Sequence, residues 1–153
     1  RPNRERVPRV HCDFHFNKHV RQNNARAELH DALGDSDVMV YQERKVRRLE
    51  LWENKTHYAF VVSPHGVGLD CHRTWESLVL GNIVIVKRSS LDPLYAGLPV
   101  VIVDDWREVT ADSLARWPEQ YADSFADPEV QRRLTNDYWI EHMRAITRAA
   151  LEK

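Results

Sequence analysis

Short apolar runs alternate with segments of helical spacing along most of the chain. Residues 58–62, 83–86 and 100–103 are almost wholly apolar, as strands of a parallel sheet are when both of their faces are buried. Residues 10–16 alternate apolar and polar positions, which indicates a further strand, and 37–41 predicts a short one. Strands that alternate with helices in this way predict an α/β fold with a Rossmann-like, doubly wound parallel sheet.

The segments between these runs carry apolar residues at helical spacing. Gly34 and Gly81 stand where two of these segments end, as glycine commonly does after the last helical turn. Asp70 is placed to cap the third helix, and Pro128 suits the first position of the last one. The predicted helices span residues 20–33, 43–54, 70–80, 113–125 and 128–151.

Composition and length place the chain among globular domains. Its 153 residues include 42% hydrophobic and 29% charged side chains, which suits one core and argues against a disordered chain. No apolar stretch approaches the roughly 20 residues of a membrane span, and the first residues do not form a signal peptide. The net charge of −1 argues against a broad nucleic-acid surface. We therefore expect a single soluble domain over residues 1–153, with no membrane segment and no nucleic-acid partner.

The loop after residues 58–62 is the most distinctive local motif. It contains Gly66 and Gly68, two of only five glycines in the chain, where backbone amides can approach an anion without a Cβ in the way. In the helix that follows, Arg73 and Glu76 are three residues apart and share a face. The cation suits a diphosphate, and the carboxylate suits ribose hydroxyls. The motif predicts a nucleoside diphosphate pocket, and the alternative is an ordinary ion pair between these two side chains.

Polar residues also follow the other predicted strands. In open parallel sheets the ligand binds beyond the carboxyl ends of the strands, so the loops at those ends should meet along one edge. These loops contain Asn17, Lys18 and His19, residues 65–73, residues 87–90 and residues 104–106. Polar side chains are therefore expected around the predicted pocket.

The segment 58–90 resembles the donor-binding signature of exostosin-like GT-B glycosyltransferases. The pattern in that family is a hydrophobic strand, Ser-Pro or Cys-Pro, a small polar turn, Arg-x-x-Glu on a helix, a glycine and a second hydrophobic strand. Residues 89–95 and 103–106 are also similar to it. The chain departs from the pattern at Val67, Asn82 and Val84. None of these departures removes a phosphate or ribose contact.

The resemblance implies that Arg73 contacts the donor diphosphate, that Glu76 holds the ribose, and that the glycine turn cradles phosphate. The implied donor-binding residues are His65, Gly66, Val67, Gly68, Asp70, His72, Arg73 and Glu76. The chain would then be one half of a GT-B glycosyltransferase. Such an enzyme transfers a sugar from a nucleoside diphosphate donor, by default a UDP sugar, to a glycan hydroxyl.

The resemblance also implies that part of the reaction depends on a second domain. In that family the glycan acceptor, and commonly the general base, belong to an N-terminal domain, so no catalytic base is assigned here. The domain alone is expected to bind its donor but barely to catalyse, without a metal or another cofactor. A microbial or viral parent protein would be cytoplasmic, whereas a eukaryotic one would face the Golgi lumen through a membrane anchor.

Two other functional classes fit parts of the sequence. A non-catalytic nucleotide-binding or interaction module would keep the pocket without a partner domain. A Rossmann-type dehydrogenase is disfavoured, because residues 16–19 lack the dinucleotide glycine fingerprint.

Other clusters of reactive side chains favour structural roles. His11, His15 and His19 recur every four residues, a spacing that lines up ligands on a helix, but the pattern around them predicts a strand. Asp104 and Asp105 suit a turn and a cap better than an acid–base pair. Cys12 and Cys71 lack the spacing of a disulfide framework, so we expect buried free thiols.

Overall fold

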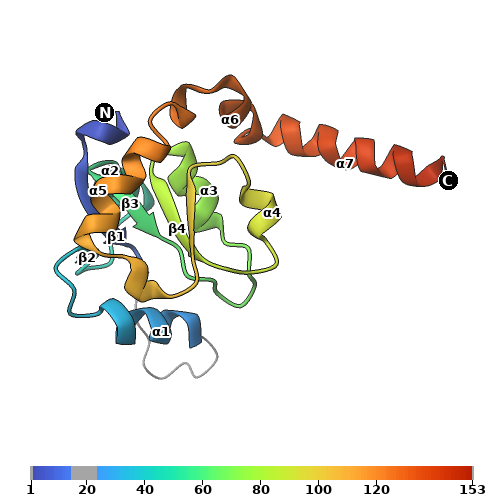
Figure 1. Cartoon of the computed structure of the whole chain (residues 1–153). Coiled ribbons are helices and arrows are strands. Elements are labelled where there is room, and N and C mark those ends of the chain that lie inside the picture. The colour runs from blue at the N-terminus through green and yellow to red at the C-terminus, as the bar shows by residue number, and fades with distance from the viewer. Residues whose placement is uncertain (1, 15–23, 153) are drawn as a thin grey trace.

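Five parallel strands form the central sheet of the protein, with helices around it (Figure 1). The structure is a computed structural model and describes residues 2–14 and 24–152. The strands lie in the order β2-β1-β3-β4-β5, and each neighbouring pair is parallel. Their bounds are β1 Val7–Cys12, β2 Met39–Tyr41, β3 Tyr58–Val62, β4 Ile83–Lys87 and β5 Val100–Val103. This order confirms the predicted α/β fold with a Rossmann-like, doubly wound sheet.

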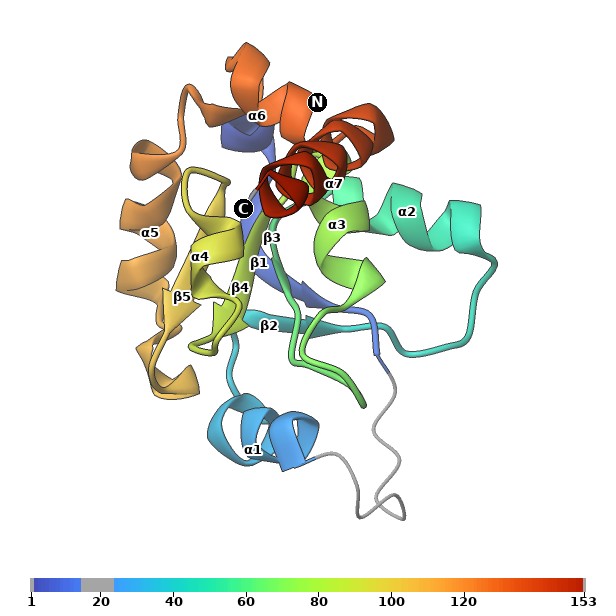
Figure 2. The same ribbon diagram turned by 90° about the vertical axis from the view of Figure 1, so that its right-hand side faces the viewer.

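Helices cover both faces of the sheet. Figure 2 shows α5 on one side of the strands and α2 with α3 on the other. The α-helices of the described segments are α1 Asn24–Leu33, α2 Arg48–Thr56, α3 His72–Val79, α4 Asp92–Tyr95, α5 Ala111–Gln120, α6 Pro128–Arg133 and α7 Asn136–Leu151. Short 3-10 helices are η1 Asn3–Glu5, η2 Trp106–Glu108 and η3 Ser124–Ala126.

The inner strands bury side chains on both faces. In β4, Ile83 and Ile85 belong to one hydrophobic core, whereas Val84 and Val86 belong to a second one. The first core also contains Phe60, Leu29, Trp106 and Leu114, and the second contains Leu78, Tyr95 and Val130. Burial on both faces explains why the predicted strand runs contain almost no polar residue.

The first strand begins three residues earlier than predicted. β1 runs from Val7 to Cys12, so Asp13 and Phe14 already lie beyond its carboxyl end. Residues 15–16 of the predicted strand and 20–23 of the predicted first helix fall outside the described residues. The early end of β1 brings Asp13 to the sheet edge, where the site is built.

The second helix begins at Arg48, five residues later than predicted, and continues to Thr56. The residues before it fold back toward the helix instead of extending it. Arg44 Nη2 lies 2.6 Å from Glu50 Oε1, and Gln42 Nε2 donates to the Arg44 carbonyl at 3.2 Å. These bonds connect the irregular segment before α2 to the helix.

The helix predicted over 128–151 is divided into α6 and α7 at Thr135. Pro128 occupies the first position of α6, as predicted. The Thr135 hydroxyl donates to the Arg132 carbonyl at 2.7 Å and accepts from the Tyr138 backbone N–H at 3.3 Å. A hydroxyl that bonds to nearby backbone offers the chain an alternative to a continuous helix, and here it caps α7.

The fifth helix begins two residues earlier and ends five residues earlier than predicted. Thr110 and Ser113 form a reciprocal capping box at its start, with hydrogen bonds of 3.2 and 2.9 Å. Just after its end, the Tyr121 hydroxyl donates to the Val100 carbonyl at 2.8 Å. This bond ties the chain that leaves α5 to strand β5.

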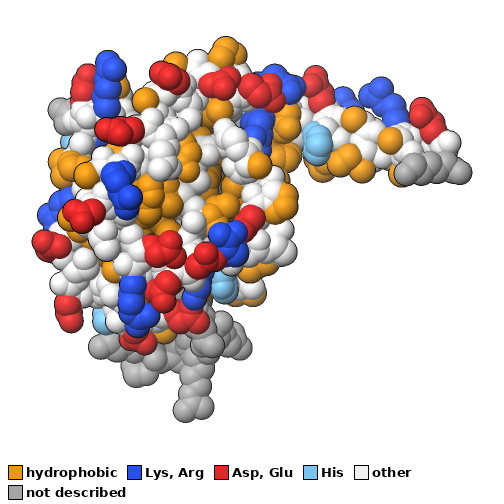
Figure 3. Space-filling view, viewed as in Figure 1, with side chains coloured by type: hydrophobic (Ala, Val, Ile, Leu, Met, Phe, Trp, Pro, Cys, Tyr) orange, Lys and Arg blue, Asp and Glu red, His pale blue; other side chains and the backbone are white. Residues whose placement is uncertain are grey.

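The last helix, α7, projects away from the rest of the domain (Figure 1). Apolar side chains lie along it in the space-filling view (Figure 3), and its exposed large hydrophobic residues are Ile140, Met143, Ile146 and Leu151. Over the described residues, no helix combines the length and the apolarity that crossing a membrane requires.

Candidate functional site

The candidate site lies where β1 and β3 meet at the carboxyl edge of the sheet. The chain moves from β1 outward to β2 and then returns across β1 to β3, so the direction of winding changes between β1 and β3. Open α/β sheets bind ligands in the crevice at such a switch point. Asp13 and Phe14 leave β1 there, and the loop 63–71 leads from β3 into α3. The predicted glycine loop is therefore at the edge where the fold favours a ligand.

A network of charged side chains lies at this edge of the sheet. Arg73 Nε and Lys55 Nζ lie 2.5 and 2.8 Å from the two carboxylate oxygens of Asp13. Lys55 is also 4.0 Å from Glu76, which pairs with Arg48 at 2.9 Å. The Lys55 side chain is fully buried and that of Asp13 is 6% exposed. Burial alone would raise the pKa of the Asp13 carboxyl, but the charges of Arg73 and Lys55 outweigh it and hold this pKa below its ordinary value.

Arg73 lies beside the glycine loop but is held from several directions. Its Nη1 donates to the Pro64 carbonyl at 3.3 Å and to Cys71 Sγ at 3.4 Å. Its guanidinium carbon is 5.1 Å from the centre of the Phe14 ring. Arg73 pairs with Asp13 and Glu76 pairs with Arg48, so the alternative of an isolated Arg73–Glu76 ion pair on a solvated face is wrong.

A second arginine, Arg26 of α1, lies over the same ring. Its guanidinium carbon is also 5.1 Å from the Phe14 centroid. Its Nε is buried and has no hydrogen-bond partner in the part of the chain that the structure describes. Burial lowers the pKa of Arg26, and the charge of Arg73 lowers it further. Two cations thus lie over one ring, and among the residues that the structure describes Asp13 is the one carboxylate bonded to Arg73.

The sequence alone did not reveal Asp13, Arg26 or Lys55 as site residues. Asp13 was placed inside a predicted strand, and a strand ending at Cys12 would have assigned it to the crevice by the carboxyl-edge rule. Arg26 and Lys55 lie within helices, where a single basic residue carries no local signal of a ligand.

Glu76 faces helix α2. Its Oε1 accepts from Arg48, and its Oε2 accepts from the indole Nε1 of Trp52 at 3.2 Å. The side chain keeps 21% of its surface exposed. Two carboxylate oxygens offer about four acceptor positions, so capacity for ribose hydroxyls remains.

The glycine loop leaves its tip open. The Gly66 N–H donates to the Gly68 carbonyl at 3.2 Å. Neither glycine has a positive φ, and a Cβ added at Gly66 would meet no atom within 4 Å. The loop conformation therefore does not require glycine, while the absence of side chains leaves the backbone accessible. Val67 and Gly68 are exposed at the tip.

The two predicted histidines lie apart. His72 is exposed at the first position of α3, whereas His65 is half-buried and its Nδ1 is 3.2 Å from the Gly66 carbonyl oxygen. His65 lines a small pocket of about 20 Å³ on the β4 side of the loop. The pocket is lined by Ser63, His65, Leu69, Val86, Lys87, Ser89 and Tyr95.

Asp70 does not join the other predicted donor residues, and the prediction that it caps α3 is wrong. Cys71 is the N-cap residue, and its side chain makes no capping hydrogen bond. Asp70 Oδ1 instead accepts from the Cys71 N–H and from the Trp75 indole, both at 2.9 Å. The bond to the indole draws the carboxylate toward Trp75, away from the crevice side chains Arg73 and Glu76.

The predicted histidine series and the Asp104–Asp105 pair have different surroundings in the structure. Within residues 2–14 and 24–152, no group of three or more His, Cys, Asp or Glu side chains could hold a metal ion. His11 is buried and stacks on Tyr58, and burial lowers its pKa. His15, which was predicted within the first strand, and the predicted loop residues 17–19 lie outside the described residues. Asp105 caps η2 by accepting from the Arg107 N–H at 2.8 Å, which confirms its predicted capping role.

The two cysteines are free and differ in environment, which gives a labelling prediction. Cys12 is buried, and burial raises the pKa of its thiol to about 12, whereas Cys71 is half-buried in the loop before α3. Because the thiolate is the reactive form, iodoacetamide at about pH 8 should modify Cys71 first and Cys12 only after unfolding. Peptide mass spectrometry over time measures both rates. Equal rates in the folded chain would contradict the buried placement of Cys12, and Cys71→Ser should remove the fast phase.

Comparison with models of known protein families gives no match, and a search of curated protein sequences finds no significant match.

Proposed function

We propose that this chain is the nucleotide-sugar-binding domain of a glycosyltransferase that moves a sugar from a nucleoside diphosphate to a glycan hydroxyl. The observation that carries the proposal is the placement of Arg26 and Arg73 over the same Phe14 ring at the switch point of the sheet. Their mutual repulsion is only partly offset by Asp13. A diphosphate bound there would supply the missing negative charge.

The chemistry of the donor fits this pair of cations. When the glycosidic bond breaks, negative charge grows on the departing nucleoside diphosphate. Guanidinium groups stabilise such a charge with paired, charge-assisted hydrogen bonds worth roughly 1.5–3 kcal/mol each. Arg73 is held by the Pro64 carbonyl and by Cys71 Sγ, so little conformational freedom is lost when the ligand binds.

Glu76 supports recognition of the nucleoside. It lies one helical turn beyond Arg73 on α3, with its carboxylate oriented by Arg48 and Trp52. A carboxylate held in this way can accept hydrogen bonds from both ribose hydroxyls. The similarity of residues 58–90 to the exostosin-like donor signature supports the same two roles, with UDP as the default nucleotide.

The proposal assigns donor binding, and not the whole reaction, to the described residues. A second domain would hold the glycan acceptor and supply the general base. The donor would bind without a metal, because Arg26 and Arg73 take the charge-neutralising role that a divalent cation has in other glycosyltransferases.

Titration calorimetry with UDP, GDP and their sugars, with and without EDTA, tests the proposal. We expect saturable binding that survives EDTA. Arg26→Ala should weaken it by about 1.5–3 kcal/mol, or roughly 10- to 150-fold. Arg73→Lys keeps the cation beside Asp13 but loses the planar fork, so it should weaken binding without unfolding the domain. Arg132→Ala, at an exposed ion pair on α6, is the matched control.

The ribose role is tested separately with Glu76→Gln. This variant should bind UDP more weakly than the wild type while its affinity for inorganic diphosphate stays unchanged. Equal affinity of the wild type for UDP and inorganic diphosphate would refute the ribose role. If no nucleotide binds to the folded chain, the donor-binding proposal itself fails.

A further inference from the structure

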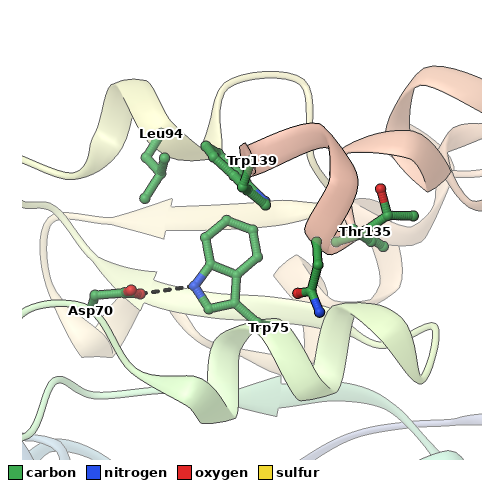
Figure 4. A pocket seen from close by; sticks show the side chains of 7 residues that line it. Asp70, Trp75, Leu94, Thr135 and Trp139 are labelled. Carbon is green, nitrogen blue, oxygen red and sulfur yellow. Dashed lines mark hydrogen bonds between the residues drawn. The ribbon is translucent and has the colours of Figure 1, made fainter. Parts of the chain in front are cut away.

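A second pocket, of about 330 Å³, lies between α3 and the beginning of α7 (Figure 4). Its lining comes from four parts of the fold: the loop before α3, α3 itself, α4, and the junction of α6 with α7. The lining residues are Asp70, Trp75, Leu94, Leu134, Thr135, Asn136 and Trp139. Its size is in the range of sites for small molecules.

Two tryptophans form the apolar walls of this pocket, which we call the indole pocket. The rings of Trp75 and Trp139 lie 5.5 Å apart at an angle of 76°. Each indole N–H is already bonded within the protein: Trp75 donates to Asp70 and Trp139 donates to the Arg133 carbonyl, both at 2.9 Å. Figure 4 shows Trp139 of α7 beside Trp75 of α3, with the two rings meeting edge to face. The indoles therefore contribute apolar surface and not further donors to a ligand.

The polar part of the lining consists of a carboxylate, an amide and a hydroxyl. Asp70 makes both of its hydrogen bonds through Oδ1, so Oδ2 keeps its capacity to accept. Asn136 is exposed at the first position of α7 and adds both donors and an acceptor. The Thr135 hydroxyl already serves as the cap of α7. Among the described residues no lysine or arginine lines the pocket, and Asp70 is the one charged side chain in this lining.

The walls are fixed before any ligand binds. Arg133, next to the junction of α6 and α7, donates from Nη1 to the Ala96 carbonyl and from Nη2 to the Leu94 carbonyl. Trp75 also lies 6.3 Å from the ring of Tyr95 in the second core. A preorganised pocket loses less conformational entropy on binding.

We propose that the indole pocket binds an uncharged sugar ring of a glycan. A pyranose presents C–H groups on its faces, which fit the aromatic walls, and hydroxyls on its rim, which can donate to Asp70 and exchange hydrogen bonds with Asn136. The carboxylate and the absence of cations disfavour phosphates and acidic sugars. A purely apolar ligand would desolvate Oδ2 of Asp70 without giving it a donor.

The inference goes beyond the proposed function and does not depend on it. The indole pocket uses the side of α3 that carries Trp75, whereas Arg73 contacts Asp13 just after β1 and Glu76 contacts α2. A glycan held there would be a second ligand of the domain, bound without a nucleotide.

Binding of neutral disaccharides to the whole chain tests the inference. Cellobiose, lactose, maltose and N,N′-diacetylchitobiose are titrated by saturation-transfer NMR and by tryptophan fluorescence, and the chain is also applied to an array of neutral glycans. At least one of these probes should bind and shift the tryptophan emission. Trp139→Ala should weaken that binding at least about tenfold, as loss of an aromatic anchor does, and Asn136→Ala should weaken it several-fold.

Three further variants make the outcome decisive. Ile146→Ala, on the exposed part of α7 outside the pocket, should leave sugar binding unchanged. Arg73→Lys should also leave it unchanged, which separates this pocket from the nucleotide site. If Trp139→Ala loses its far-UV circular dichroism, Asn136→Ala decides, because Asn136 is exposed. Failure of every neutral sugar to bind the folded chain, or binding that Asn136→Ala and Asp70→Asn leave intact, would overturn the inference.

Discussion

Replacing Asp13 with asparagine should lower the free energy of unfolding by about 3–5 kcal/mol, the usual cost of removing one partner from a buried ion pair. The Asp13 carboxylate is 6% exposed and pairs with both Lys55 and Arg73. The fully buried ammonium group of Lys55 then loses its charged partner at 2.8 Å, and its other contacts within the described residues are Ser77 Oγ at 3.4 Å and Glu76 at 4.0 Å. Urea denaturation followed by far-UV circular dichroism measures the loss.

A second substitution separates the charge effect from a packing effect. In the Asp13→Asn background, Lys55→Met removes the uncompensated cation while keeping a side chain of similar length. The double variant should therefore recover at least about 1 kcal/mol relative to Asp13→Asn alone. Asp104→Asn, at an exposed pair with Arg88, is the matched control and should not shift the midpoint. If the double variant is no more stable than Asp13→Asn, the unpaired charge of Lys55 is not the cause of the lost stability.

The stability that the Asp13 carboxylate contributes depends on pH. The folded-state pKa of Asp13 lies below the ordinary value of 3.8, so the carboxylate contributes its full stability at neutral pH. That contribution is lost as the pH falls below this value and through the folded-state pKa. The Asp13→Asn variant should accordingly lose less stability on acidification than the wild type does.

Replacing Phe60 with alanine should also lower the free energy of unfolding by about 3–5 kcal/mol. Phe60 is fully buried in the central strand β3, and its backbone is in register with Val10 of β1 and Ile83 of β4. Its ring meets the Trp117 ring edge to face at 6.1 Å. The substitution removes that contact and leaves a cavity that a parallel sheet covered on both faces cannot collapse to fill. Urea denaturation measures the change.

Two controls bracket the Phe60 result. Phe60→Leu keeps most of the volume and should cost less than about 1.5 kcal/mol. Leu49→Ala, at a position that is 76% exposed on α2, should leave the midpoint nearly unchanged. Similar losses for Phe60→Ala and Leu49→Ala would contradict the placement of Phe60 in the core.

Asp13 links the stability of the domain to its proposed function. It neutralises Arg73 in the absence of ligand, at the position where a diphosphate would compete for the same guanidinium. The Asp13→Asn variant should therefore be less stable and yet bind UDP at least as tightly as the wild type. This combination would show that the ion pair serves the folded state and not ligand binding.

Much of the architecture could be predicted because strands that are buried on both faces consist almost entirely of apolar residues. Residues 58–62 and 100–103 are strands with the predicted bounds, and 83–86 is one residue short of β4. Gly81 follows the third helix with a φ of 78°, a conformation that favours glycine. The end of this helix could therefore also be predicted from the sequence. Predicted helix bounds were wrong where a side chain competes for backbone hydrogen bonds, as the Thr135 hydroxyl does between α6 and α7.

The sequence by itself determined the order of strands and helices and the place of the glycine loop after β3, because these depend on burial patterns and turn residues that are local in the chain. Only the tertiary structure decided the sites. Asp13 meets Arg73 across 60 residues of chain, Arg26 shares the Phe14 ring with Arg73, and Trp75 meets Trp139 from another helix. Such partners are selected by how helices pack on the sheet, and charge or aromatic character at one position does not encode which distant position it will contact.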